Sequence, residues 1–293
     1  MYSNTLILLL AVLLRIVANP LANVFQKKLT VSGVSALTVN FLTYFILGAA
    51  CLIFSVRLDW HTINAEYYVY SVIMGLLGAL GNLYLVKALQ MGDLSVLGPI
   101  NAYKAVISML IGLFVLNEIP SVLGLAGVGL IIFGSYFVLN TTEDGFSWAL
   151  FKRKEIQYRI WAMILTATEA IFVKKVILVS SVTQAFFSWC WFGALFSFVL
   201  LLFNKIPLKA EMQKLNPRAV TYIWLLVGCI GIAQFSTGFI FDRMPVGYAL
   251  SLFQLSVLVN IFLGYRIFKE EDILKKLIGA IIMIAGSVLI ILF

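Results

Sequence analysis

Ten long apolar segments, separated by short polar links, dominate the sequence. Each is long enough to cross a bilayer, which takes about 20 apolar residues in a helix. Of the 293 residues, 62% are hydrophobic and only 12% are charged, and the mean hydropathy is +1.03. The first segment is too long for a signal peptide, so we expect it to remain as a membrane helix. The sequence therefore predicts an all-α polytopic membrane protein with ten transmembrane helices, at residues 3–26, 34–56, 67–90, 95–116, 121–140, 157–179, 183–204, 219–241, 246–268 and 273–293.

The second half of the chain repeats the first. A shift of 152 residues places Gly127 on Gly279 and Gly134 on Gly286. Further pairs, at shifts of 153 or 147, are Gly75 with Gly228, Gly78 with Gly231, Met91 with Met244, Phe25 with Phe172, Lys27 with Lys174 and Lys28 with Lys175. An ordered set of matches across the chain indicates an internal duplication. Because five is odd, the second copy enters the membrane from the opposite face, which predicts two inverted five-helix repeats, residues 1–145 and 146–293.

Lysine and arginine predict the orientation. Fifteen of the 21 lie in the links after the first, third, fifth, seventh and ninth segments, and only four lie on the opposite side. Such residues face the cytoplasm in membrane proteins, so we expect both termini outside, in the plasma (bacterial inner) membrane. The net charge of +8 therefore reflects the orientation of the chain in the membrane and contact with anionic lipid. It does not indicate nucleic-acid binding.

Polar residues enter several segments on single helical faces. Arg15, Asn19 and Asn23 are four residues apart, and Asn101 and Lys104 are three apart after Pro99. Ser108 continues the second face, Glu169 follows Thr166, and Gln254 accompanies Ser251 and Tyr248. An ionisable group inside a membrane marks a functional site by default. The predicted substrate-binding residues are Lys104, Glu169, Asn101, Arg15, Asn19, Asn23, Gln254 and Tyr248.

Each polar residue also has a structural interpretation. Asn82, Gln234 and Thr237 fit interhelical hydrogen bonding better than ligand contact. Arg15 could instead extend to the membrane surface. Glu169 could form a static ion pair with Lys104 or Arg15. Glu118 and Glu270 lie at links, where contacts with a helix start or a loop are expected.

The chain resembles the EamA family of the drug/metabolite transporter superfamily. The resemblance rests on KALQMGDLSVLGP at 87–99, a further apolar run, LNE at 116–118, the following glycine-rich segment and a second copy of the link at Phe268 to Glu270. It implies ten helices in two inverted repeats around a central pore lined by helices 1, 3, 4, 6, 8 and 9. Those are the helices that carry polar groups here. Family members move many kinds of small metabolite, and they usually keep both termini in the cytoplasm, opposite to the charge count.

The leading hypothesis is a secondary active transporter that moves a small polar or zwitterionic metabolite by alternating access, with export as the favoured direction. Lys104 would bind a carboxylate or phosphate, and Glu169 an amine or a coupled proton. Alternatives are a lipid or lipid-linked sugar flippase, a multidrug exporter and a non-transporting structural subunit.

No enzyme is expected, since the sequence has no His-Glu-x-x-His and no Gly-x-Ser-x-Gly. No cofactor or metal is expected either. The oligomeric state and the substrate stay open.

Overall fold

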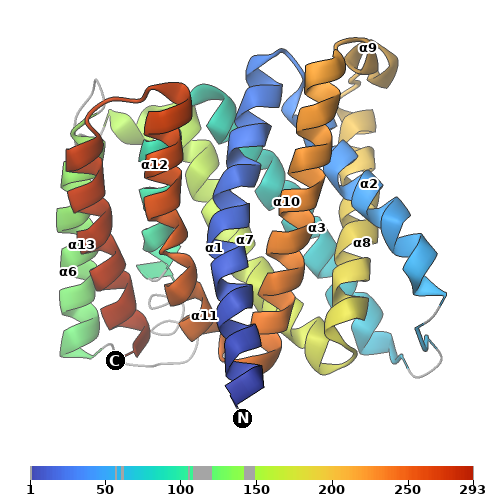
Figure 1. Cartoon of the computed structure of the whole chain (residues 1–293), viewed down its shortest axis with the longest axis horizontal. Helices are drawn as coiled ribbons and strands as arrows, with labels where there is room; N and C mark the ends of the chain where they lie inside the picture. Colours follow the sequence, from blue (N-terminus) through green and yellow to red (C-terminus); the bar gives the residue numbers. More distant parts are fainter. Residues whose placement is uncertain are drawn as a thin grey trace.

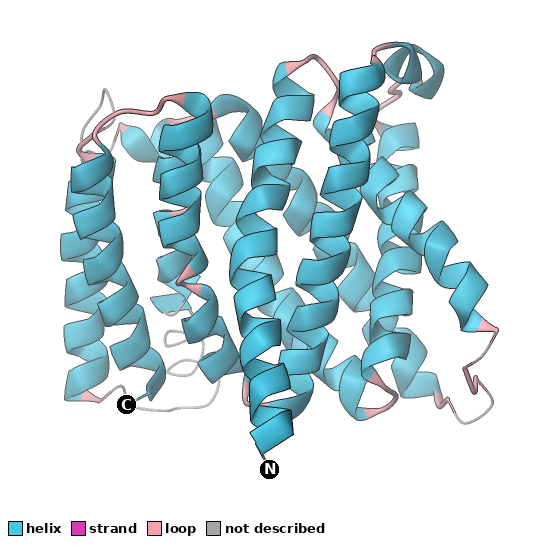
Figure 2. Cartoon of the chain, in the orientation of Figure 1, coloured by secondary structure: helices cyan, strands magenta, loops and turns pink. Residues whose placement is uncertain are grey.

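The computed structural model describes residues 2–56, 58–60, 63–104, 106–107, 121–141 and 149–292. Within these ranges the regular structure is helical and no strand occurs (Figure 2). The first half contains α1 (Tyr2–Val31), α2 (Ala36–Ser55), α3 (Ala65–Met91), α4 (Leu94–Leu97), η1 (Pro99–Ala102) and α6 (Val122–Leu139). The second half contains η2 (Leu150–Lys152), α7 (Lys154–Leu178), α8 (Val182–Phe203), α9 (Leu208–Gln213), α10 (Pro217–Arg243), α11 (Val246–Phe253), α12 (Ser256–Phe268) and α13 (Ile273–Leu292).

The described residues confirm the predicted membrane helices except in the fourth segment, most of which lies outside them. Eight helical spans in the described residues are long and apolar enough to cross a membrane. Each of the remaining two predicted segments has an ionisable group near its centre. Segment 157–179 is α7, a helix of 25 residues that carries Arg159, Glu169, Lys174 and Lys175. Segment 95–116 begins with α4 and η1 and continues beyond the described residues. The fold is that of a polytopic membrane protein with ten helices in two repeats.

Two predicted segments differ in detail from continuous helices. The ninth is broken at Gln254 and Leu255 into α11 and α12. The fourth changes from α-helix to 3₁₀-helix at Gly98, where Pro99 begins η1. Hydrophobic spacing does not show such breaks because every piece is apolar. The predicted polar link 205–218 also contains a short helix, α9.

Polar side chains determine where several helices begin. Each capping residue accepts a hydrogen bond from the backbone N–H three residues later, which satisfies a donor that has no partner within the helix. The caps are Ser35 for α2, Asn64 for α3, Ser121 for α6, Ser181 for α8 and Asn216 for α10. In α10 the cap is followed by Pro217, whose missing N–H costs nothing at the first helical position.

The helix contacts follow the inverted repeat. Helices α1 and α7 are equivalent, as are α3 and α10. In the structure α1 packs on α10 and α3 packs on α7, so exchange of the two repeats converts one contact into the other. The equivalent pairs α2 with α8 and α6 with α13 pack on each other. Figure 1 shows α1 beside α10, and α6 beside α13 at the left edge.

Glycines bring α6 and α13 into backbone contact. A Cβ added at Gly127 would lie 2.6 Å from the carbonyl oxygen of Gly286, and one added at Gly134 would lie 2.6 Å from that of Gly279. As the residue number rises on one helix it falls on the other, so the two helices are antiparallel. Gly127 is the repeat equivalent of Gly279, and Gly134 that of Gly286. The two contacts are therefore exchanged by the pseudo-two-fold axis.

The glycine contact predicts a position-specific loss of stability. Gly134→Ala forces a methyl group against the α13 backbone and should lower the free energy of unfolding by about 1–3 kcal/mol. Gly129→Ala is the matched control in the same helix, because a Cβ there has no neighbour within 4 Å. Thermal unfolding of both purified variants in detergent measures the difference. Equal stability of the two would contradict close α6–α13 packing.

The inversion and the orientation can be tested together. Met91 is at the end of α3, and Asp242 is near the end of the equivalent helix α10; both are exposed. In a background with Cys51, Cys190 and Cys229 changed to serine, Asp242→Cys should react with an impermeant thiol reagent in intact cells. Met91→Cys should react only after permeabilisation. The reverse pattern would contradict the charge-based orientation, and reaction of both in intact cells would contradict the inversion.

Candidate functional site

A cavity of about 160 Å³ lies between the two repeats. The first repeat contributes residues of α1, α2, α3 and the region from Gly98 to Lys104. The second contributes residues of α7, α8, α10, α11 and α12. Six of the predicted site residues line it: Arg15, Asn19, Asn23, Asn101, Lys104 and Glu169. The helical spacing of the first three therefore places one face of α1 on the cavity.

Gln254 and Tyr248 do not line the cavity. Gln254 is fully buried and its side-chain amide donates to the backbone oxygen of Asn101, at 3.4 Å. Tyr248 is 48% exposed. The residues of α11 that line the cavity are the apolar Leu250 and Phe253, which a search for polar residues at helical spacing does not select. Ser108, also expected on the cavity face, lies outside the described residues.

Three residues assigned to interhelical bonding also line the cavity: Asn82, Gln234 and Thr237. Asn82 donates to Asn40 at 2.6 Å and accepts from Gln26 at 3.0 Å. Thr237 accepts from Nε of Arg15 at 2.7 Å. For Asn82 and Thr237, the described contacts therefore confirm the interhelical role and add a place at the cavity wall.

Glu169 is held by an aromatic residue rather than by a cation. Its Oε1 accepts a hydrogen bond of 2.6 Å from the indole N–H of Trp189 on α8. Gly78 on α3 leaves the space, because a Cβ there would lie 2.6 Å from the same oxygen. Among the described contacts, no hydrogen bond or ion pair within 4.0 Å joins Glu169 to Lys104 or Arg15. The expected static ion pair is therefore not seen in the described residues.

Both arginines at the cavity have neutral partners. The guanidinium of Arg15 lies 4.8 Å from the centre of the Phe253 ring, so this side chain turns into the protein and not toward the membrane surface. Arg159 is grouped with the link residues in the charge count, but it lies within α7 and lines the cavity. Its Nε donates to the backbone oxygen of Leu97 at 2.8 Å. Its spacing of seven and ten residues from Thr166 and Glu169 on α7 was the available sequence signal.

Other cavity residues carry no clear sequence signal. Tyr44 and Trp189 sit in strongly apolar runs, where an aromatic residue usually packs or faces lipid. The position of Asn260 on α12 could not be predicted from helical periodicity, because the break in the segment precedes it. Its Oδ1 accepts from Nδ2 of Asn23 at 3.2 Å, so α1 and α12 meet across the cavity.

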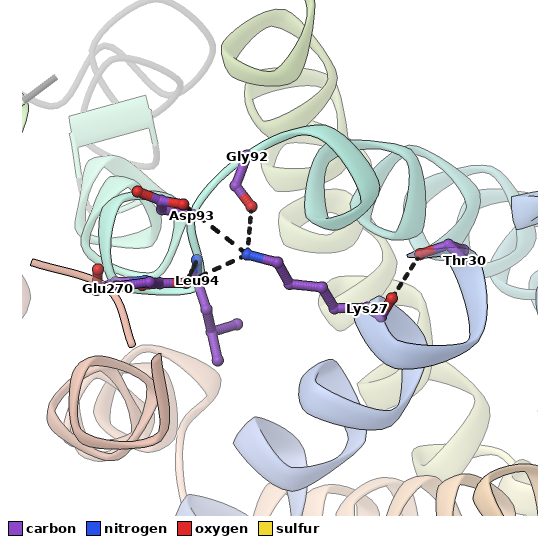
Figure 3. Close-up of polar contacts among 7 residues, drawn as sticks. Lys27, Thr30, Gly92, Asp93, Leu94 and Glu270 are labelled. Carbon is purple, nitrogen blue, oxygen red and sulfur yellow. Dashed lines mark hydrogen bonds and ion pairs between the residues drawn. The ribbon is translucent and has the colours of Figure 1, made fainter. Parts of the chain in front are cut away.

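One turn beyond Asn23, Lys27 continues the contacts between the repeats (Figure 3). Its Nζ donates to the backbone oxygen of Gly92 at 2.9 Å and to Oε1 of Glu270 at 3.2 Å. Asp93 lies 4.0 Å from the same nitrogen. These contacts join α1 to the α3–α4 turn and to the α12–α13 link. They lie at the end of the helix bundle where α1 finishes, the upper edge in Figure 1.

Glu270 also satisfies the start of a helix in the other repeat. Its two carboxylate oxygens accept the backbone N–H groups of Leu94 and Ser95, each at 2.8 Å. Asp93, at the N-cap position of α4, makes no side-chain cap bond of its own. The predicted helix-start contact is thus confirmed for Glu270, whereas Glu118 lies outside the described residues.

The environment of Glu270 stabilises its charged form. Burial alone would raise its pKa, but hydrogen bonds from Ser95 and Leu94 and the charge of Lys27 outweigh burial. The net effect lowers the pKa of Glu270 below the usual carboxyl value.

Comparisons with known proteins identify the relatives. A model described as "EamA-like transporter family" matches residues 6–140 and 153–292. Among solved structures 28 chains match. One of them, described only as "Crystal structure of protein", has a TM-score of 0.62 and 17% identity, and the match covers 99% of this chain and 96% of that one. This likeness shows the fold alone. No curated protein matches.

The lowered pKa of Glu270 predicts a pH effect on stability. A carboxyl whose folded pKa lies below its unfolded pKa, about 4.3 for glutamate, stabilises the fold fully above that value and loses the effect as pH falls through the folded pKa. The wild type should therefore lose stability between about pH 5 and pH 3 more steeply than Glu270→Gln. The exposed neighbour Glu271→Gln is the control and should keep the wild-type slope. Thermal unfolding across this pH range tests it, and parallel curves for Glu270→Gln and wild type would contradict it.

Proposed function

Because the chain belongs to the EamA-like transporter family, within the drug/metabolite transporter superfamily, we propose that it is a secondary active transporter of a small polar or zwitterionic organic metabolite. The protein is an integral membrane protein of a transporter family, and members of that family are not enzymes. The observation that carries the proposal is the cavity at the repeat interface, where both halves contribute ionisable side chains: Arg15 and Lys104 from the first, Arg159 and Glu169 from the second.

Alternating access follows from the inverted repeats, which commonly rock around a central site in transporters. In this state the buried contacts of Lys27 and Glu270 join the two halves one turn beyond the cavity residue Asn23. Movement of the two halves apart at this end of α1 requires the separation of these contacts. We propose export across the plasma (bacterial inner) membrane. Glu169, the one carboxylate among the described lining residues, is the candidate carrier of a coupled proton.

The size of the cavity favours a small metabolite. Pockets for drug-sized ligands have volumes of about 300–1,000 Å³, whereas this cavity has about 160 Å³. The volume therefore argues against the multidrug alternative. A lipid flippase would need a lateral opening, and the described contacts supply no observation in its favour. We also propose that the repeats divide at residues 145 and 146.

The central charges provide the test of this site. The variant that combines Lys104→Met with Glu169→Gln removes one charge of each sign from the cavity. If these groups bind substrate, it should retain its fold and lose transport. The control combines Lys209→Met with Glu66→Gln, an exposed pair outside the cavity, and should transport normally.

The measurement is exchange of a metabolite mixture by purified protein in liposomes, read by mass spectrometry, together with thermal unfolding. A double variant that transports at the wild-type rate would show that Lys104 and Glu169 have only a structural role.

A further inference from the structure

The cavity has more positive than negative groups. Its described lining contains three cations, Arg15, Lys104 and Arg159, and a single carboxylate, Glu169. All four side chains line the same cavity. The two arginines therefore repel Lys104, and among the charged groups of the described lining only Glu169 attracts it.

The protein does not neutralise this excess within the described residues. Arg15 donates through Nε to the Thr237 hydroxyl, and Arg159 donates to the Leu97 carbonyl, both neutral acceptors. Lys104 has no hydrogen-bond or ion-pair partner in the described part of the chain. Glu169 accepts from an indole and not from a cation. A cation without a charged partner in a poorly hydrated site is strongly disfavoured.

Unused polar atoms point to the same conclusion. Within the described residues, Nη1 of Arg15 and the hydroxyl oxygen of Tyr44 are buried without a hydrogen-bond partner, and both residues line the cavity. Buried polar groups are normally satisfied, so each such atom needs a partner that the described part of the chain does not supply.

A buried cation that does not line the cavity gives a contrast. Lys27 has a carboxylate, Glu270, at 3.2 Å and a backbone oxygen at 2.9 Å. Its contacts hold two repeats together, and the chain provides the counter-charge. The cations of the cavity lack this arrangement, so their counter-charge is expected from a ligand.

We infer that the substrate is a small organic anion, with more acidic groups than basic ones. This inference rests on the proposed transport function and narrows its substrate class. A carboxylate or phosphate would be bound by Arg15, Lys104 and Arg159, and Arg groups can bind either one through two parallel hydrogen bonds. The amides of Asn19 and Asn101 also line the cavity and can bind neutral polar groups. Glu169 accommodates at most one amine or hydroxyl of the ligand.

Matched compounds that differ in charge test the inference. The probes are L-glutamate against L-glutamine, L-aspartate against L-asparagine, succinate against succinamide, and glycerol 3-phosphate against glycerol. Thermal stabilisation of the purified wild-type protein is measured at constant ionic strength, since a ligand of the native state raises its apparent stability. The expected result is stabilisation by an acid and about tenfold or more weaker binding of its neutral partner, which corresponds to about 1.4 kcal/mol. The phosphate and carboxylate pairs distinguish the two kinds of acidic group.

Variants assign the effect to the cavity. Arg15→Gln, Lys104→Gln and Arg159→Gln should each weaken binding of the stabilising acid about tenfold or more. Lys209→Gln, an exposed lysine away from the cavity, should leave it unchanged. Arg15→Lys keeps the positive charge but loses the two parallel hydrogen bonds, and it replaces Arg15→Gln in this test if that variant does not fold. The wild-type comparison needs no variant at all.

Two results would overturn the inference. Stabilisation by the neutral compounds as strong as by the acids, or none by any acid, rules out an anionic substrate. In either case, liposomes that still exchange neutral solutes leave the transport function intact. Liposomes that exchange no solute of a broad metabolite mixture contradict the transport function itself.

Discussion

A charged or polar side chain is costly in hydrocarbon, and this cost decides which face each helix turns to the lipid. Helix α1 shows the effect within one element. Leu9 and Leu13 are 57% and 60% exposed, as expected for a lipid-facing surface, whereas Arg15 and Asn19 line the cavity. The interior that this sorting produces is polar, and the two repeats must enclose it together. The cavity therefore follows from the same constraint that makes the outer surface apolar.

The contact of Lys27 with Glu270 satisfies buried polar groups at the end of α1 and at the start of α4. Helix α4 is only four residues long and its cap residue makes no side-chain bond, so its first N–H groups need an acceptor from elsewhere. Glu270 provides it from the other repeat, and Lys27 provides the counter-charge. Contact between the two repeats and capping of α4 thus depend on one carboxylate. If the repeats separate here, both N–H groups become available to water, which limits the free-energy cost of the separation.

Much of this architecture could be predicted from the sequence. Helix number, repeat symmetry and the cavity face of α1 follow from segment length, matched glycines and a spacing of four residues. None of these depends on how the helices pack. The contributions of Trp189 and Tyr44 could not be predicted, because only packing between helices places an aromatic residue of an apolar run beside a carboxylate. Tyr248 and Gln254 were assigned from a polar spacing, whereas α11 lines the cavity with the apolar Leu250 and Phe253. Arg159 was missed because a cation near a helix start usually serves the membrane surface.

The scaffold is symmetric, but the charges in its cavity are not. At the repeat shift of 147, Arg15 corresponds to Ala162, Arg159 to Val12 and Glu169 to Ala22; at 152, Lys104 corresponds to Ser256. Two identical five-helix chains assembled as an antiparallel dimer would have to present every one of these groups twice. They would then place like charges close together across the axis. Fusion of the two copies into one chain removes that restriction, so each half can carry its own charges while the glycine contacts of the shared framework stay alike.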